Sequence, residues 1–359
     1  MDSPIRVMIV DDSAVVRQTL TALINKQSDM KVVETAIDPI IAQQKLPVAK
    51  PHILILDMEM PRMDGITFLG ILMEKTPMPV IVFSSVSQPG SVKALEALRL
   101  GAVDVLGKPH GSYSVGEMGI QLVEKIRGAA HVKINRRATS AMAQPLVRPS
   151  VTKPINLVPP TASVGWDGPI VLIGASTGGT EALKEVLMRL PENFPPLLIV
   201  QHIPPVFSKA FADRLNDLCA IDVKEACDGD GLRPGLALVA PGNYHMMLAR
   251  NGRQWRVRVA DGPPVWHQRP AVDVLFKSAV EHAGPRIVAA ILTGMGKDGA
   301  EGLLKLRKAG AKTFGQTEET CVVYGMPRAA FELGACEKMV PLQRMAEQLC
   351  QSVHLASHV

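Results

Sequence analysis

Residues 5–12 read Ile-Arg-Val-Met-Ile-Val-Asp-Asp, a short apolar run that ends in two carboxylates. An amphipathic stretch follows it, and the same alternation of strand and helix patterns continues to about residue 127. Such alternation is typical of a parallel sheet with helices on both faces. We expect strands at 5–10, 31–36, 53–57, 80–84 and 103–106, and helices near 13–27, 38–46, 65–75, 90–100 and 117–127.

The pattern is lost over residues 128–168, where five prolines lie among scattered Ser, Thr and Ala. We predict a flexible, semi-extended linker there. It holds five Lys or Arg against one Asp, so it supplies +4 of the chain's net charge of +5. Positive charge gathered in a linker, rather than on a folded face, argues against a nucleic-acid partner.

The alternation resumes at residue 169 and predicts a second α/β domain over 169–355. We expect strands at 170–174, 197–202, 236–240 and 287–293, a hairpin at 245–250 and 254–260, and helices near 179–190, 206–218, 271–283 and 299–309. A chain of 359 residues with 47% hydrophobic residues can bury two such cores. The sequence therefore predicts two doubly wound, mainly parallel domains, at 4–127 and 169–355.

The five cysteines and the apolar runs bear on where the protein works. The cysteines form no C-x-x-C pair, which argues against a disulfide framework or a zinc site. No signal-peptide pattern precedes the first strand, and no uninterrupted apolar run approaches the ~18 residues of a membrane span. We expect a cytoplasmic protein without membrane insertion.

Polar side chains gather at the predicted strand ends of the first domain. Asp11 and Asp12 follow the first strand, and Asp57 ends the third. The carboxyl ends of parallel strands meet at one edge of a sheet, and crowded carboxylates need a cation, for which Mg²⁺ is suited. Ser84 and Lys108, after the fourth and fifth strands, could engage a phosphoryl group. One such residue alone is typical of a cap or turn, but five together indicate a site.

A candidate nucleophile stands in Gly174-Ala-Ser-Thr-Gly-Gly179, between a predicted strand and helix. The glycines allow a tight turn that presents Ser176 near N–H groups that favour an oxyanion. His202 ends the next predicted strand and is the candidate base. Asp298 follows the strand at 287–293 and is the candidate orienting acid. It could also cap the helix at 299–309, and both roles stay open. No metal is expected in this domain.

Four other interpretations of the second half are weaker. A dinucleotide site wants Gly where Ser176 stands and an acid where Gln201 and His202 end the next strand. An α/β-hydrolase order would place the histidine after the acid, where only His354 and His358 remain, at the chain's end. A DNA-binding output needs a basic recognition helix, which the near-balanced charge does not supply. A catalytically dead binding module conflicts with the intact nucleophile, base and acid.

The first domain resembles the receiver domain of two-component response regulators. The resemblance covers residues 4–127 and includes Asp57-Met-Glu-Met-Pro-Arg-Met-Asp-Gly65. It implies a flavodoxin-like fold, phosphorylation of Asp57 by a histidine kinase, and Mg²⁺ held by Asp11 and Asp12 together with Asp57.

The second domain resembles chemotaxis protein-glutamate methylesterases, the CheB family. The motifs that carry the resemblance are Gly174-Ala-Ser-Thr-Gly-Gly-Thr-Glu181, Gln201-His-Ile-Pro-Pro205, Ala240-Pro-Gly-Asn-Tyr-His245, Pro270-Ala-Val-Asp-Val-Leu-Phe276, Ile291-Leu-Thr-Gly-Met-Gly-Lys-Asp-Gly299 and Val323-Tyr-Gly-Met-Pro-Arg328. The resemblance implies Ser176 as nucleophile, His202 as base, Asp298 as orienting acid and the Met295 backbone N–H as an oxyanion donor.

The same resemblance implies the substrates, which are glutamyl methyl esters and glutamines of chemoreceptors. Residues 266–269, Trp-His-Gln-Arg, depart from the family's pattern.

A flexible linker cannot transmit strain between the domains like a rod. We therefore expect the unphosphorylated first domain to inhibit the hydrolase by packing directly near Ser176.

Overall fold

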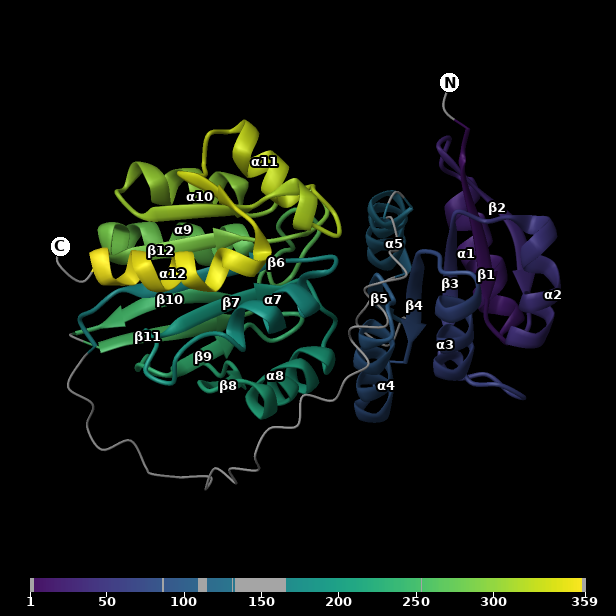
Figure 1. Ribbon diagram of the computed structural model, residues 1–359, viewed down its shortest axis with the longest axis horizontal. Coiled ribbons are helices and arrows are strands. Elements are labelled where there is room, and N and C mark those ends of the chain that lie inside the picture. Colours follow the sequence, from purple (N-terminus) through teal and green to yellow (C-terminus); the bar gives the residue numbers. More distant parts are fainter. Residues whose placement is uncertain are drawn as a thin grey trace.

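The computed structural model describes residues 3–85, 87–108, 115–130, 132, 166–252 and 254–356. Two α/β units lie side by side, the N-terminal one in purple and blue and the C-terminal one from teal to yellow (Figure 1). The predicted linker at 128–168 lies outside the described residues, except for 128–130, 132 and 166–168.

The N-terminal domain is a five-stranded parallel sheet in the order β2-β1-β3-β4-β5. This is the flavodoxin-like order, as predicted. Its strands are β1 (Ile5–Val10), β2 (Met30–Ala36), β3 (Ile53–Asp57), β4 (Val80–Ser84) and β5 (Asp104–Gly107). Its helices are α1 (Ala14–Asn25), α2 (Pro39–Ala49), α3 (Gly65–Lys75), α4 (Gln88–Arg99) and α5 (Val115–Ala129). The boundary expected at residue 127 therefore falls inside α5.

Burial explains why the central strands read as continuous apolar runs. Every residue of β3 and β4 is buried. Helices cover both faces of a parallel sheet, so its inner strands cannot alternate between core and solvent. Each of these two strands is apolar up to its last residue, which is polar although it is buried: Asp57 in β3 and Ser84 in β4. These residues mark the edge of the sheet where the acidic side chains gather.

The C-terminal domain is a seven-stranded sheet in the order β14-β13-β12-β6-β7-β9-β8, and each neighbouring pair is parallel. Its strands are β6 (Ile170–Ala175), β7 (Leu197–Gln201), β8 (Asp222–Glu225), β9 (Leu236–Val239), β12 (Ile287–Ile291), β13 (Lys312–Gln316) and β14 (Lys338–Val340). The predicted hairpin is present as β10 (His245–Asn251) and β11 (Gln254–Ala260). The two-domain, doubly wound fold class is confirmed.

The helices of this domain are α7 (Gly179–Leu187), α8 (Phe207–Leu218), α9 (Val272–Ala283), α10 (Ala300–Lys308), α11 (Met326–Glu332) and α12 (Leu342–Ala356), with short 3₁₀ turns at η1 (Gly284–Arg286) and η2 (Glu318–Thr320). The sequence prediction did not include β8, β13, β14, α11 or α12. The three strands are only three to five residues long, too short to show a hydrophobic period.

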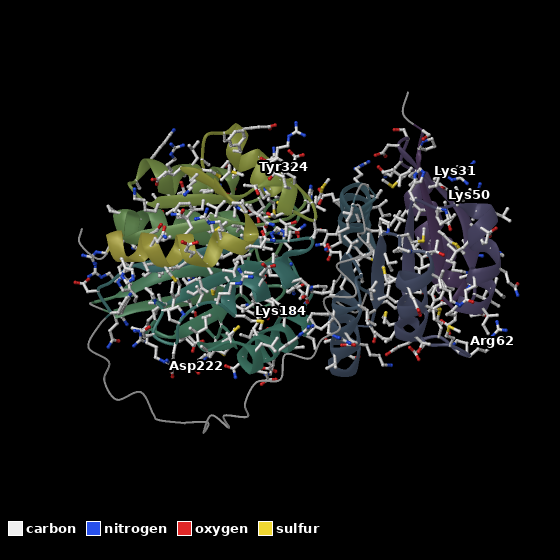
Figure 2. The ribbon with its side chains drawn as sticks, viewed as in Figure 1. Lys31, Lys50, Arg62, Lys184, Asp222 and Tyr324 are labelled. Carbon is white, nitrogen blue, oxygen red and sulfur yellow. The ribbon has the colours of Figure 1, made fainter. Side chains whose placement is uncertain are left out.

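The two domains meet through one side of the N-terminal sheet. Helices α4 and α5 face the C-terminal domain (Figure 1), and α4 packs against α7 and α8. Lys184 of α7 lies on the facing side of the C-terminal domain, whereas Lys31, Lys50 and Arg62 lie at the far side of the N-terminal one (Figure 2). The junction is tied by a hydrogen bond of 3.1 Å from Arg214 to the Leu95 carbonyl oxygen.

Candidate active site and phosphorylation site

The three catalytic candidates follow three adjacent strands of the C-terminal sheet. Ser176 follows β6, His202 follows β7, and Asp298 lies in the loop after β12. Strand β6 lies between the other two, so the carboxyl ends of all three strands meet at one edge. The strands that follow β6 in the chain lie on both of its sides, β7 on one and β12 on the other. Open α/β sheets bind ligands at the carboxyl ends of strands where the strand order reverses in this way.

His202 and Asp298 are in direct contact. The His202 Nε2 atom lies 2.8 Å from the Asp298 Oδ2 atom, and both side chains are buried. Because the carboxylate accepts a hydrogen bond, it selects the tautomer with the proton on Nε2. The buried Nδ1 atom has no hydrogen-bond partner within the described residues. Nδ1 is therefore the ring nitrogen available as a base.

The Asp298 carboxylate is also held by the start of helix α9. Its Oδ2 accepts from the Val272 N–H at 2.6 Å, and its Oδ1 accepts from the Asp273 N–H at 2.9 Å. These N–H groups carry the positive end of the helix dipole and stabilise a negative charge. The prediction that Asp298 could cap the following helix is wrong, because Gly299 is the N-cap residue of α10. The Asp298 carboxylate instead accepts hydrogen bonds from the first N–H groups of α9.

Two glycines shape the surroundings of Ser176. Gly178 caps α7 with a φ of +76°, a left-handed conformation that lets the chain turn sharply after the serine. A Cβ atom on Gly294 would lie 2.7 Å from the Ser176 Cβ, so only glycine lets that loop approach. Ser176 itself is 5% exposed.

The loop that approaches Ser176 continues into Met295, the residue expected to supply an oxyanion donor. Met295 directly follows Gly294, and the Ser176 N–H donates to the carbonyl oxygen of Thr293 at 3.0 Å. The loop after β12 therefore lies against Ser176 on one side and carries Asp298 on the other. This arrangement brings the Met295 backbone close to the serine.

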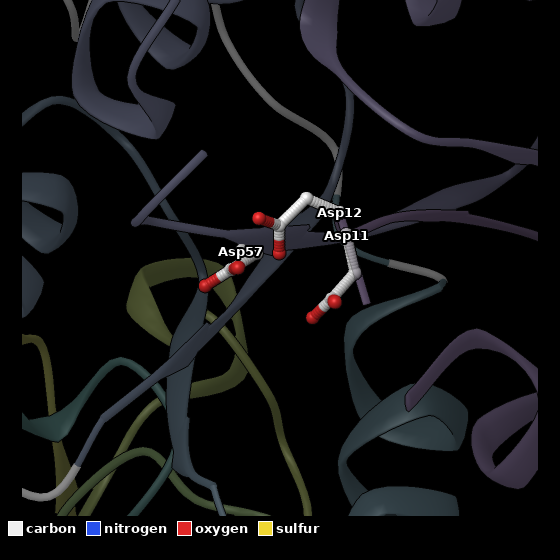
Figure 3. Close-up of side chains that lie close together, drawn as sticks. All are labelled: Asp11, Asp12 and Asp57. Carbon is white, nitrogen blue, oxygen red and sulfur yellow. The ribbon is translucent and has the colours of Figure 1, made fainter. Parts of the chain in front are cut away.

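The five residues chosen in the N-terminal domain also lie at a single sheet edge. Ligand oxygens of Asp11, Asp12 and Asp57 lie within 4.8 Å of one another (Figure 3). Ser84 ends β4, one residue after Phe83, which pairs with Asp57 on β3, and the Ser84 hydroxyl donates to the Gly90 carbonyl oxygen at 3.3 Å. Within the described ranges, this acidic cluster is the single group of metal-ligating side chains close enough to share an ion.

Lys108 is the cation of this cluster. Its Nζ atom lies 2.8 Å from the Asp57 Oδ2 and 3.3 Å from the Asp11 Oδ2. Burial raises the pKa of Asp57 and of Asp11, although Lys108 opposes the rise. Burial acts against the charge of Lys108, but its contacts with the two carboxylates outweigh that effect and raise its pKa.

The carboxylates are nonetheless incompletely satisfied. The Oδ2 atoms of Asp11 and Asp57 are buried, and within the described residues Lys108 is their single partner. Buried carboxylate oxygens in this state are the donors that Mg²⁺ prefers. The acidic cluster is therefore consistent with a magnesium site.

Comparisons with known proteins match both halves of the chain. The CheB methylesterase family matches residues 171–349, and the response regulator receiver domain matches residues 7–118. A protein-glutamate methylesterase/protein-glutamine glutaminase of Syntrophus aciditrophicus is 50% identical, over 98% of this chain and 100% of that protein. One of Pectobacterium atrosepticum is 47% identical, over 98% of this chain and 97% of that protein.

The chain belongs to the protein-glutamate methylesterase/protein-glutamine glutaminase family. The catalytic domain of the Thermotoga maritima CheB methylesterase has a similar structure, with a TM-score of 0.51 and 38% identity, over 53% of this chain and all of that one. The family and the enzyme class predicted from the sequence are confirmed, with a receiver domain at the N-terminus and a methylesterase domain after it. Across the described residues, no helix has the length and apolar character needed to cross a bilayer.

The receiver closes over the methylesterase site. A cavity of about 10 Å³ is lined by Ser176 and His202 from one domain and by Leu98, Val103 and Asp104 from the other. Such a volume holds about one water molecule and no glutamyl side chain. At the end of α5, a Cβ on Gly128 would lie 2.9 Å from the Met295 Sδ, so the receiver also packs on the loop beside Ser176.

A buried polar contact joins the two domains next to Ser176. The Thr177 hydroxyl donates to the Asp104 Oδ2 at 2.5 Å, and the Lys125 Nζ lies 2.6 Å from the same oxygen. We name this group the interdomain triad. A carboxylate taken out of water is stable only when it is paired and hydrogen-bonded, so the triad stabilises the closed arrangement while both domains contribute to it.

Sequence reasoning did not identify Asp104, Thr177 or Gln201 as functional. The Gln201 Nε2 donates to the Ser176 carbonyl oxygen at 2.8 Å and so holds the backbone at that serine. The available signal for Asp104 was a carboxylate inside the apolar run Ala102-Val-Asp-Val-Leu106. For Thr177 and Gln201, the available signal was that they are the sequence neighbours of Ser176 and His202.

Proposed function

We propose that this enzyme hydrolyses glutamyl methyl esters, and deamidates the corresponding glutamines, on chemoreceptors. The observation that carries the proposal is the buried arrangement of Ser176, His202 and Asp298 at adjacent strand ends in a chain of this family. Hydrolysis of the ester would restore a glutamate on the receptor and so serve adaptation in chemotaxis.

The chemistry follows from the protonation of His202. With its Nε2 proton held by Asp298, the Nδ1 atom takes the Ser176 proton as the hydroxyl oxygen attacks the side-chain carbonyl. The protonated ring then gives that proton to the leaving group, which departs as methanol from an ester or as ammonia from an amide. Water, deprotonated by the same nitrogen, attacks the acyl-enzyme, and the ring returns that proton to the Ser176 oxygen as the product carboxylate is freed.

The negative oxygen of the tetrahedral intermediate needs a donor. We assign this role to the Met295 N–H, because its loop lies against Ser176 at Gly294. A well-placed backbone donor is worth roughly 3–4 kcal/mol of transition-state stabilisation. The helix α9 N–H groups stabilise Asp298, so that the charge on His202 is balanced when it forms.

In the receiver, we propose that Asp57 accepts a phosphoryl group from a histidine kinase. Asp11, Asp12 and Asp57 would hold Mg²⁺, which neutralises the crowded carboxylates and the incoming phosphoryl oxygens. Lys108 already pairs with Asp57 and would keep the added charge in place, and the Ser84 hydroxyl would donate to it.

We propose further that the unphosphorylated receiver inhibits the enzyme. The closed cavity at Ser176 and the interdomain triad support this, because a polypeptide substrate could reach the serine only if the domains separate. Coupling of this kind is usually 1–3 kcal/mol, or roughly 5- to 150-fold in activity.

The experiment is methanol release from methylated receptor membranes, with and without a small-molecule phosphodonor. We expect release that the phosphodonor increases roughly 5- to 150-fold. A chain that lacks residues 1–132 should be active without the phosphodonor and insensitive to it. If the truncated chain is no more active than the unphosphorylated whole, the receiver acts instead as an activator or a localisation module. No methanol from any methylated receptor would refute the proposed substrate.

A further inference from the structure

A tight turn beside the active site has an unusual backbone. Val265 and Gln268 exchange two backbone hydrogen bonds of 3.0 Å, so Trp266 and His267 are the central residues of a two-residue hairpin. Both have positive φ, +51° and +59°. Asn-Gly usually occupies such turns, since bulky side chains are strained there. Backbone strain of this kind persists where the surroundings enforce it, and it clusters at ligand-binding sites.

The Trp266 side chain projects from this turn and is fixed by contacts with two neighbouring residues. Its Nε1–H donates to the Asp273 Oδ2 at 3.0 Å. Asp273 is fully buried and is also held by the Gly302 N–H and by the Lys277 ammonium, so the anchor is fixed in place. The ammonium of Lys297 lies 4.0 Å from the centroid of the indole ring. The ring is therefore fixed in orientation, with a cation on one face.

This pair is next to the catalytic machinery. Lys297 immediately precedes Asp298. Asp273, which anchors Trp266, also gives its backbone N–H to Asp298. The His267 carbonyl oxygen accepts from the Gln121 Nε2 of the receiver at 3.2 Å, so the turn borders the interface that closes the site.

Both side chains are accessible where a substrate would approach. Trp266 is 36% exposed despite its buried anchor, and Lys297 is exposed. In the described part of the chain, Lys297 forms no ion pair with a carboxylate, and its ammonium lies over the indole ring. A rigid aromatic ring with an unpaired cation suits a polypeptide that offers apolar groups and a carboxylate.

We propose that Trp266 and Lys297 bind the substrate polypeptide beside the reacting side chain and set its specificity. Trp266 contacts apolar groups of the substrate segment, and Lys297 pairs with an acidic residue that flanks the target glutamyl ester. The strained turn is maintained because it delivers the indole to that position. This inference rests on the proposed function, in that the substrate is a polypeptide that carries glutamyl esters.

The test uses the full-length enzyme, activated by a phosphodonor, and two helical peptides. Each peptide carries one glutamyl methyl ester, flanked one turn away by glutamates in the first peptide and by glutamines in the second. We expect Trp266→Asn to raise KM for both peptides roughly tenfold, the effect of losing a central aromatic contact, with little change in kcat. Trp266→Phe should recover much of the loss. Asn tolerates a positive φ, and the strain it relieves offsets the lost hydrogen bond to Asp273, so the melting temperature of Trp266→Asn should change little.

Lys297→Gln should raise KM for the glutamate-flanked peptide about three- to fivefold and remove the preference over the other peptide. Lys308→Gln is the matched control, because Lys308 is exposed at the opposite end of α10. A preference that survives in Lys297→Gln refutes the charge pairing.

Three outcomes distinguish a failure of the proposed function from a failure of this inference. If the wild-type enzyme releases no methanol from methylated receptor membranes, the proposed function fails. If it does, but Trp266→Asn lowers kcat at unchanged KM, the turn only supports Asp298 and the specificity role is wrong. An unaltered KM and kcat would equally refute it.

Discussion

The two domains each place a buried aspartate at the carboxyl edge of a parallel sheet, but they surround it differently. Asp298 of the methylesterase domain accepts from His202, Val272 and Asp273, so both of its oxygens are engaged. Asp57 of the receiver accepts from the Glu59 N–H on one oxygen, and among the described residues Lys108 is the single partner of its other oxygen.

This difference matches two kinds of chemistry. A carboxylate that only orients a histidine performs best when every partner is already in place, because nothing must reorganise during the reaction. A carboxylate that must accept a phosphoryl group and a cation has to leave an oxygen available. The carboxyl edge of a parallel sheet therefore supports both kinds of site. We call the site of Asp298 the preorganised site and the site of Asp57 the exchangeable site.

The sharpest test of the preorganised site removes the nucleophile. Ser176→Ala should lower kcat for ester hydrolysis by about 10⁴-fold or more, because the covalent route is lost. The small side chain fits the same turn, so circular dichroism should match the wild type. An alanine variant with near wild-type turnover would show that the serine mechanism is wrong.

The second test separates base from orienting acid. His202→Ala should cost about as much as Ser176→Ala, and combining the two should add little, because they act as one unit. Asp298→Asn should cost less, roughly 10²- to 10⁴-fold in kcat. It should also lower the melting temperature, because the N–H groups of Val272 and Asp273 lose a charged acceptor. Simple additivity of the losses would contradict the assignment.

The exchangeable site should respond to reagents that leave the preorganised one unaffected. Chelating divalent cations with EDTA should abolish phosphodonor activation, a loss of roughly 5- to 150-fold, while basal hydrolysis persists. Asp57→Ala should show the same low, unresponsive activity with cations present. Methanol release measures both effects. If EDTA stops basal hydrolysis as well, the cation serves the methylesterase domain and the contrast between the sites fails.

The smallest expected effect concerns the interdomain triad, which connects the two sites. Asp104→Ala should raise basal activity about three- to tenfold, because closure loses the hydrogen bond from Thr177 and leaves Lys125 without its partner. Asp104→Asn keeps an acceptor for Thr177 and should show a smaller rise. Basal methanol release without a phosphodonor is the readout, and a basal rate that falls in both variants would exclude a role in inhibition.

Much of the fold could be predicted because its signals are local. The strands at 5–10, 53–57 and 80–84 have the predicted bounds, since buried parallel strands are continuous apolar runs ended by polar residues. The short strands β8 and β14 carry no such signal. Their place in the sheet depends on neighbours distant in the sequence.

The sequence by itself determined the residue types at the strand ends, and with them the chemistry available. Asp11, Asp57, Ser176 and His202 each follow or end a strand whose apolar pattern is readable without a structure. Because the carboxyl ends of parallel strands share an edge, the sequence alone assigns those residues to two sites.

Only the tertiary structure decided which groups touch. It placed β12 beside β6, which brings Asp298 to His202, and it directed that carboxylate to α9 rather than to α10. It also seated the receiver on Ser176 through Asp104 and gave Trp266 its strained turn. These contacts join residues far apart in the chain, and no local period encodes them, because they depend on how finished elements pack.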